Sequence, residues 1–135
     1  MLDAISYMSD KFIKLSTSFD ELHPPDNVLQ DDKNSFWITT GLFPQLLVIS
    51  FAEASKIGRV RILSSCIKNI WIEVSSQTEP EDFEVKSELI LAYSDGHQQI
   101  TEVPMNEPNM RHLRLNIRSG YDHFVAVYKV VLEKN

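Results

Sequence analysis

The segment from Asn27 to Trp37, with the sequence NVLQDDKNSFW, gathers oxygen-bearing side chains into a short stretch. Carboxylate, amide and hydroxyl oxygens held in one loop are the hard ligands that Ca²⁺ takes in proteins. The same residue types also favour turns, because their side chains hydrogen-bond to nearby backbone groups. The segment therefore predicts either a calcium site or a solvated acidic turn, and the residues alone leave both open.

Cysteine and histidine give little support to a zinc site. Cys66 is the single cysteine, and no pair of these residues has the C-x-x-C or H-x-x-x-H spacing of zinc ligands. The four histidines are His23, His97, His112 and His123. Cys66 lies in an apolar-rich stretch, which predicts a buried thiol in a reducing compartment.

Nucleophilic catalysis needs a serine or cysteine beside a histidine that a carboxylate orients. Asp122 and His123 are an adjacent acid and imidazole. Neighbours in a strand point to opposite faces, so we expect these side chains not to pair unless the turn at Gly120 bends them together. The sequence contains no G-x-S-x-G elbow and no glycine-rich phosphate loop. It therefore predicts a protein that is not an enzyme.

The run from Thr39 to Gln45, TTGLFPQ, combines turn-forming residues with two large apolar ones, Leu42 and Phe43. Loops are normally polar, so apolar side chains here indicate either a contact surface for a partner or a plug over the open end of a core. We expect Tyr121 and Phe124 to join such a contact surface. Aromatic residues within apolar strand patterns are typical of a core, and this interpretation applies to Trp37 and Trp71.

The elements that must position these residues are strands. Runs of β-branched and aromatic residues with a period of two recur along the chain, and helical periodicity is weak. We expect strands at residues 11–17, 47–51, 60–64, 70–75, 87–93, 113–119 and 125–133. The segment 94–97 reads as a turn, and 102–109, which is rich in Pro and Asn, as a loop between strands.

Many short strands with alternating faces must bury one face of each sheet, and two sheets stacked face to face do so. The prediction is an all-β, jelly-roll β-sandwich. A length of 135 residues supports one core, and the composition shows no linker or repeat, so we expect one domain covering residues 1–135.

Composition limits the partners. The net charge is −6 at pH 7, whereas affinity for a phosphate backbone depends on clustered Lys and Arg, so we expect no nucleic acid partner. No apolar run is long enough to span a bilayer, and the first residues lack the features of a signal peptide. We therefore expect no membrane insertion and a cytoplasmic chain that other proteins carry elsewhere.

Three strings make the sequence recognisable: TSFDELHPPDNVL from Thr17, FWITTGLFPQ from Phe36 and YDHFVAV from Tyr121. They resemble the intraflagellar transport protein 25 homologue family, also named heat shock protein beta-11, in order from Ser16 to Glu133. The resemblance implies a galactose-binding-domain-like jelly roll that forms a heterodimer with a Rab-like small GTPase subunit. That pair belongs to intraflagellar transport complex B of the cilium or flagellum, together with other complex B subunits.

The resemblance also implies a structural Ca²⁺. Its ligands would be the backbone oxygen of Asn27, the side chains of Asp32 and Ser35, and Glu133 in the last strand. Gln30 stands where the family has Asp, which replaces a charged oxygen by a neutral one and predicts a weaker or empty site. The alternative function is a Ca²⁺-dependent carbohydrate- or lipid-binding module, although the sequence places no ring-stacking aromatic beside polar groups.

Overall fold

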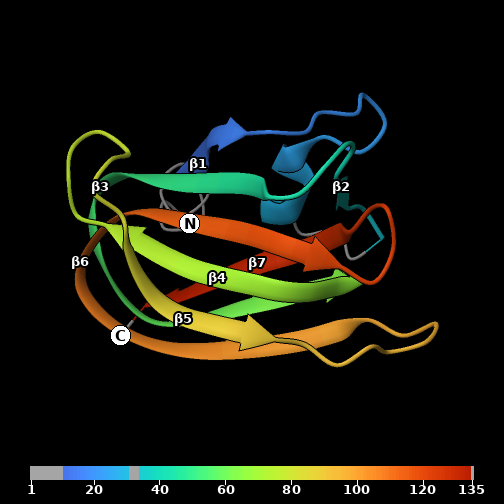
Figure 1. Ribbon diagram of the computed structural model, residues 1–135. Helices are drawn as coiled ribbons and strands as arrows, with labels where there is room; N and C mark the ends of the chain where they lie inside the picture. The colour runs from blue at the N-terminus through green and yellow to red at the C-terminus, as the bar shows by residue number, and fades with distance from the viewer. Residues whose placement is uncertain (1–10, 31–33, 135) are drawn as a thin grey trace.

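The computed structural model describes residues 11–30 and 34–134, which are built almost entirely from antiparallel strands (Figure 1). The strands are β1 (Lys11–Ser16), β2 (Trp37–Ile38), β3 (Gln45–Ser65), β4 (Ile67–Ser75), β5 (Glu84–Ile90), β6 (Gln99–Gly120) and β7 (Ala126–Lys134). A 3-10 helix, η1 (Pro25–Leu29), precedes β2. Within these described ranges, no helix has the length and hydropathy needed to cross a membrane.

β3 and β6 are long partners that pair with each other at both of their ends. Residues 45–50 lie opposite residues 112–117, and residues 59–64 lie opposite residues 99–104. The register shifts between these two paired stretches, and there both strands bend sharply (Figure 1). Each strand therefore runs through one layer, turns a corner and continues in a second.

The remaining strands extend the two layers. β1 pairs with the first part of β3, β4 pairs with the later part of β6, and β5 pairs with β4. β7 instead pairs with the later part of β3 and carries β2. One layer is thus β1-β3-β6-β4-β5 and the other is β2-β7-β3-β6, which confirms the predicted β-sandwich.

The core lies between the layers and follows the period-two pattern of the sequence, because alternate side chains of a strand share a face. β4 buries Ile70, Ile72 and Val74, and the paired part of β6 buries Leu113, Leu115 and Ile117. The second layer contributes Val60, Ile62, Val130 and Leu132 from β3 and β7. Trp37 is fully buried as predicted, and its indole Nε1 donates to the Ser18 carbonyl at 3.0 Å.

Trp71 does not lie in the core, so that prediction is wrong. It follows Ile70 in β4 and therefore points to the outer face, where it is half-buried. The guanidinium of Arg118 stacks on its ring, with Cζ 4.4 Å from the ring centroid. A cation over an indole face stabilises a large ring that the strand register keeps outside the core.

The predicted loop at 102–109 is also wrong, because this segment belongs to β6. Val103 and Met105 are buried by strand alternation, while Pro104 lies opposite Arg59. Asn106 has a φ of 52°, in the left-handed region that asparagine tolerates. The Pro and Asn signals therefore mark the corner of a bent strand and not its end.

The strand predicted at 87–93 is present but shifted towards the N-terminus. β5 begins at Glu84 and ends at Ile90, because pairing with β4 stops opposite Asn69. The predicted turn at 94–97 is confirmed, since the His97 amide donates to the Ser94 carbonyl at 3.0 Å. This turn leads directly into β6.

Candidate functional site

Loops that are distant in sequence meet at one end of the sandwich, on the right of Figure 1. The amide of Thr39 donates to the Val125 carbonyl at 3.0 Å, and the Val125 amide donates to Thr39 Oγ1 at 3.0 Å. The Tyr121 hydroxyl donates to the Leu91 carbonyl at 2.6 Å. We call residues 39–44, 90–98 and 120–125 the loop end.

The 39–44 loop is held from inside by a buried glutamine. Gln45 Nε2 donates to the Leu42 carbonyl at 2.7 Å and to the Thr40 carbonyl at 2.9 Å. Ser18 Oγ donates to Gln45 Oε1 at 2.6 Å and accepts from the Thr40 amide at 2.9 Å. Gly41 has a φ of 90°, which favours glycine. The loop is thus fixed before any partner arrives.

The two apolar residues of this loop have different roles. Leu42 is 89% exposed, whereas Phe43 is half-buried and packs against the core cluster. A methyl group on Gly120 would lie 3.0 Å from Phe43 Cζ, so the ring presses directly on the 120–125 loop. Leu42 therefore fits the interpretation of the loop as a contact surface, because it is exposed. Phe43 fits the interpretation of the loop as a plug, because it packs on the core.

Tyr121 and Phe124 are both exposed at the loop end, as expected. The Tyr121 amide donates to the Cys66 carbonyl at 2.7 Å, which fixes the start of this loop. Tyr93, 59% exposed, meets the Tyr121 ring edge-on at a centroid distance of 5.4 Å. Sequence reasoning missed Tyr93 and the exposed Ile90, since no local pattern shows that segments 30 residues apart meet.

An open pocket of about 300 Å³ lies between the 90–98 and 120–125 loops. Its lining combines aromatic rings with small polar groups: Ser65, Cys66, Tyr93, Ser94, Gly96, His97, Gln98, Phe124 and Tyr128. Buried Gln99 holds the wall in place, because its Nε2 donates to the carbonyls of Ile67 at 2.7 Å and Ala92 at 3.1 Å. The structure thus supplies aromatic rings beside polar groups, which the sequence did not reveal.

Cys66 lies at the turn between β3 and β4 with a φ of 68°. Cys66 is only half-buried, whereas the sequence predicted a buried thiol. Burial raises the pKa of the Cys66 thiol above its ordinary value of 9.0, and the nearby carboxylate of Asp122 raises this pKa further. Cys66 is therefore a protonated wall residue and a poor nucleophile.

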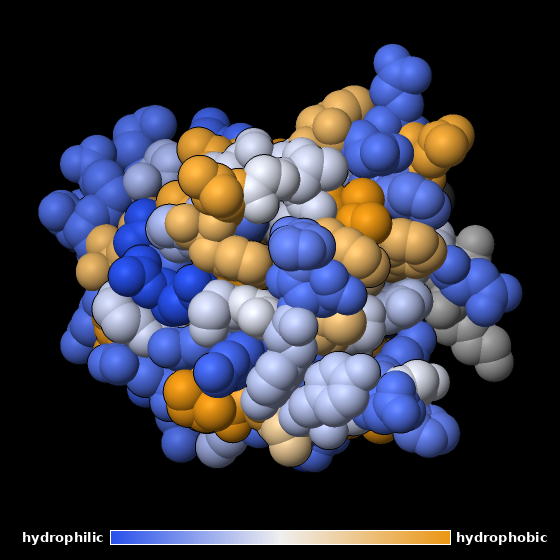
Figure 2. Space-filling model, turned by 45° about the vertical axis from the view of Figure 1, so that its right-hand side comes forward, coloured by the Kyte–Doolittle hydropathy of each residue, from blue (hydrophilic) through white to orange (hydrophobic). Residues whose placement is uncertain are grey.

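The surface of the molecule at the loop end includes exposed apolar residues. Figure 2 turns the right-hand side of the molecule forward and shows hydrophobic side chains in several patches between hydrophilic ones. The apolar residues that the loop end exposes are Leu42, Ile90, Tyr93, Tyr121 and Phe124. They come from three segments of the chain, and exposed apolar residues gathered at one end of a domain are typical of a contact surface.

The residues predicted to bind calcium are only partly described. Asp32 lies outside the described residues. Asn27 donates its side-chain amide to the Phe36 carbonyl at 2.9 Å, and its backbone oxygen accepts from the Gln30 amide at 3.1 Å. Gln30 is exposed at the end of η1, and Ser35 is half-buried. Among the described residues, no three His, Cys, Asp or Glu side chains form a group that could hold a metal.

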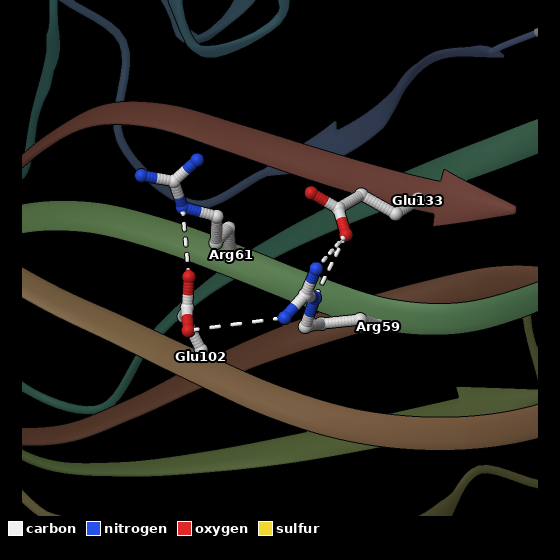
Figure 3. Close-up of polar contacts among 4 residues, drawn as sticks. All are labelled: Arg59, Arg61, Glu102 and Glu133. Carbon is white, nitrogen blue, oxygen red and sulfur yellow. Dashed lines mark hydrogen bonds and ion pairs between the residues drawn. The ribbon is translucent and has the colours of Figure 1, made fainter.

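Glu133 belongs to a charged network on β3, β6 and β7 (Figure 3). Its Oε1 accepts from Arg59 Nε at 2.7 Å, and Arg59 Nη2 lies 2.7 Å from the same oxygen as an ion pair. Glu102 lies 3.9 Å from Arg59 Nη1 and 3.2 Å from Arg61 Nε, the latter without the alignment of a hydrogen bond. The Glu133 charge is thus already compensated, so the described donors fit Ca²⁺ weakly, and the calcium site stays a prediction.

The acid and imidazole at 122–123 do not form a catalytic pair. Asp122 Oδ1 accepts from the His123 backbone amide at 2.7 Å, and the His123 side chain is exposed. A different serine–histidine contact joins β3 to β6, where Ser50 Oγ lies 2.5 Å from His112 Nδ1. Both residues are buried, so this contact links the strands without access for a substrate.

The fold and the sequence of the chain are both similar to those of known proteins. No family model matches the chain. A family 32 carbohydrate-binding module from Clostridium perfringens solved with galactose has a TM-score of 0.78 at 15% identity, covering 93% of this chain and 94% of the module. A second module from this organism, in complex with GalNAc-β-1,3-galactose, has a TM-score of 0.80 at 15% identity, covering 93% and 96%. The chain is therefore a galactose-binding-like jelly roll, as predicted.

Sequence comparison identifies the family within this class. The human protein named intraflagellar transport protein 25 homolog is 39% identical over 119 residues, which is 88% of this chain and 83% of the human one. The mouse homolog is 35% identical over 132 residues, covering 98% and 92%. The Chlamydomonas reinhardtii protein is 30% identical over 118 residues, covering 87% and 62%. The chain belongs to the intraflagellar transport protein 25 family.

Proposed function

We propose that this protein is a non-enzymatic subunit of intraflagellar transport complex B that pairs with a Rab-like small GTPase subunit. Membership of the family supports a role in intraflagellar transport, and hence work in the cilium or flagellum and the cytoplasm. The loop end supports binding as the mode of action. The burial of Ser50 and His112, and the bond from Asp122 to the His123 backbone amide and not to its ring, support a non-enzymatic role.

The exposure of Leu42 is the main observation behind this proposal. A leucine that is 89% exposed on a loop anchored by Gln45 presents apolar surface in a fixed position. Binding through a rigid loop loses less conformational entropy than binding through a mobile one. Interfaces concentrate their energy in a few such apolar or aromatic anchors. Leu42 therefore has the properties of an anchor for the GTPase, with Tyr121 and Phe124 exposed at the same end of the sandwich and Phe43 packed against the core.

The test is co-expression with the Rab-like GTPase followed by size-exclusion chromatography with light scattering, in Ca²⁺ and again in chelator. We expect a one-to-one complex in both buffers. Leu42→Glu should abolish it while leaving the melting temperature unchanged, because the side chain contacts little in the free protein. Val85→Glu is the matched control, since Val85 is also exposed but lies on β5 outside the loop end. Loss of the complex in both variants, or in neither, would count against Leu42.

A Ca²⁺-dependent carbohydrate- or lipid-binding module is the second candidate. The galactose-bound modules share the fold, and the pocket at the loop end sets Tyr93 and Phe124 beside polar groups. Sugars stack on aromatic rings and hydrogen-bond to amides and imidazoles. A glycan array and liposome sedimentation, each with and without chelator, test this candidate. Silence in both assays would leave the adaptor function alone.

A further inference from the structure

The pocket at the loop end combines aromatic rings with nearby negative charge. Tyr93 comes from the 90–98 loop, Phe124 from the 120–125 loop and Tyr128 from β7. The two loops also carry carboxylates: Asp95 accepts from the Tyr93 hydroxyl at 3.3 Å, and Asp122 lies two residues before Phe124. Both acids are exposed, and each is a neighbour in sequence of residues that line the pocket.

Two groups that line the pocket respond to these carboxylates. The pKa of the Tyr93 phenol is raised, first by the charge of Asp95, then by burial and the hydrogen bond to Asp95, and to a smaller extent by Cys66 and Asp122. The pKa of the Cys66 thiol is raised by burial and then by Asp122. The Tyr93 shift is caused first by a negative charge, and Asp122 adds a smaller effect of the same sign at Cys66. The two carboxylates therefore favour a cation beside these residues.

A neighbouring contact shows the same preference. The ammonium Nζ of Lys68 lies 5.9 Å from the centroid of the Tyr121 ring, and the Tyr93 ring lies edge-on to that ring. Lys68 is not among the residues that line the pocket. Tyr93 and Phe124, which do line the pocket, are aromatic residues of the kind that Lys68 contacts at Tyr121.

The pocket is also formed in advance. Gln99 ties the 90–98 loop to the β3–β4 turn, and the hydroxyl and amide of Tyr121 tie the 120–125 loop to Leu91 and Cys66. A volume of about 300 Å³ is at the lower end of the range for small-ligand pockets and suits one long side chain.

We propose that this pocket receives the cationic side chain of an arginine or lysine on the partner. Aromatic faces bind a guanidinium or ammonium group through the ring quadrupole, and the nearby carboxylates of Asp95 and Asp122 compensate its charge. The inference rests on the proposed pairing with a GTPase and adds to it the chemistry of one anchor. It predicts a partner surface with an apolar centre and a basic residue beside it.

The first experiment tests the pocket without the partner. The ¹⁵N-labelled protein is titrated with N-acetyl-arginine methylamide and, as a neutral isostere, with N-acetyl-citrulline methylamide. Arginine should shift the amide signals of Tyr93, Gly96 and Phe124, and citrulline should not. The double variant Asp95→Asn with Asp122→Asn, which keeps the oxygen acceptors of both residues, should lose the arginine shifts. Equal shifts with citrulline, no shifts, or shifts with galactose alone would overturn the proposal.

The second experiment tests the pocket in the complex. Neutralising Asp95 and Asp122 should weaken GTPase binding about tenfold at low salt, and less at high salt, because exposed charge pairs are screened. Phe124→Ala should weaken it by about tenfold at both salt concentrations. Glu53→Gln with Glu79→Gln, two exposed acids outside the loop end, is the matched control and should bind normally.

The two proposals fail differently. If the wild-type protein does not bind the GTPase, the proposed function is wrong, and the arginine titration alone decides whether the pocket binds cations. If the wild-type protein binds and the double Asn variant binds equally well, the cation pocket is overturned while the adaptor function stands.

Discussion

The two ends of the sandwich expose different kinds of side chain. At the loop end, apolar side chains such as Leu42, Ile90 and Tyr93 face solvent. At the opposite end, where β3 and β6 bend, Lys86 pairs with Glu84 at 3.1 Å and with Glu107 at 3.2 Å. Lys86 at the bent end is thus compensated within the chain, whereas the loop end exposes large apolar side chains from three segments. This difference supports the proposal that the loop end contacts another protein.

The largest effect should separate the two apolar residues of one loop. Phe43→Ala should lower the free energy of unfolding by about 2 kcal/mol, because it removes a half-buried ring that packs on the core. Leu42→Ala should change that free energy by less than about 0.5 kcal/mol, as is usual for an exposed side chain. Urea denaturation measures both. If both variants lost the same free energy of unfolding, the distinction between an exposed Leu42 and a packed Phe43 would be wrong.

The next effect tests how tightly the loops of this end are packed. An added Cβ at Gly120 would lie 2.8 Å from Val125 Cγ1 and 2.9 Å from the Cys66 carbonyl oxygen. Gly120→Ala should therefore cost about 1–2 kcal/mol in unfolding free energy and weaken GTPase binding, since the Phe43 ring must also move. Gly96→Ala is an informative comparison. Its Cβ would meet nothing within 4 Å, and any loss there would reflect backbone strain at a φ of 72° alone.

A smaller effect is expected at the bent end. Lys86→Ala removes two surface ion pairs, to Glu84 and to Glu107. It should lower the melting temperature by no more than about 2 °C, because surface ion pairs contribute little to stability. Added salt should reduce even this difference. GTPase binding should be unchanged. A loss of binding in Lys86→Ala would contradict the assignment of contact to the loop end.

The smallest effect concerns Cys66. Its raised pKa means that the folded protein keeps the thiol proton to a higher pH than the unfolded chain. This contribution to stability is present below the unfolded pKa and is lost as pH rises through the folded pKa, above the ordinary value of 9.0. Cys66→Ser should therefore show less decline in melting temperature between neutral pH and alkaline pH than the wild type. Identical pH profiles would contradict the effect.

Sequence reasoning found what depends on local pattern. Period-two alternation identified β4 and the later part of β6, and the unusual composition of the 39–44 loop identified Leu42. It failed where long-range pairing decides. Pro104 and Asn106 looked like a loop because turn residues do not reveal that β3 lies opposite and continues the ladder. Trp71 looked like core because an apolar pattern does not say which face of a strand is inside.

The candidate site was harder to predict for the same reason. Tyr93 follows β5 and Tyr121 follows β6, and their rings meet because both strands pair with β4. The strand register thus sets which loops become neighbours. The buried Ser50–His112 contact is likewise a cross-strand pair with no local signal. Composition can therefore nominate single exposed residues, but a pocket with walls from three segments requires the register.

β3 and β6 pass through both layers of the sandwich, so neither layer can open without loss of pairing in the other. Backbone amides in the two layers should accordingly exchange with deuterium as one cooperative unit and not layer by layer. Binding at the loop end would then slow exchange as far away as the corners at the bent end. The shared strands therefore couple the two layers, so that a force applied to one layer is carried by the backbone pairing of the other.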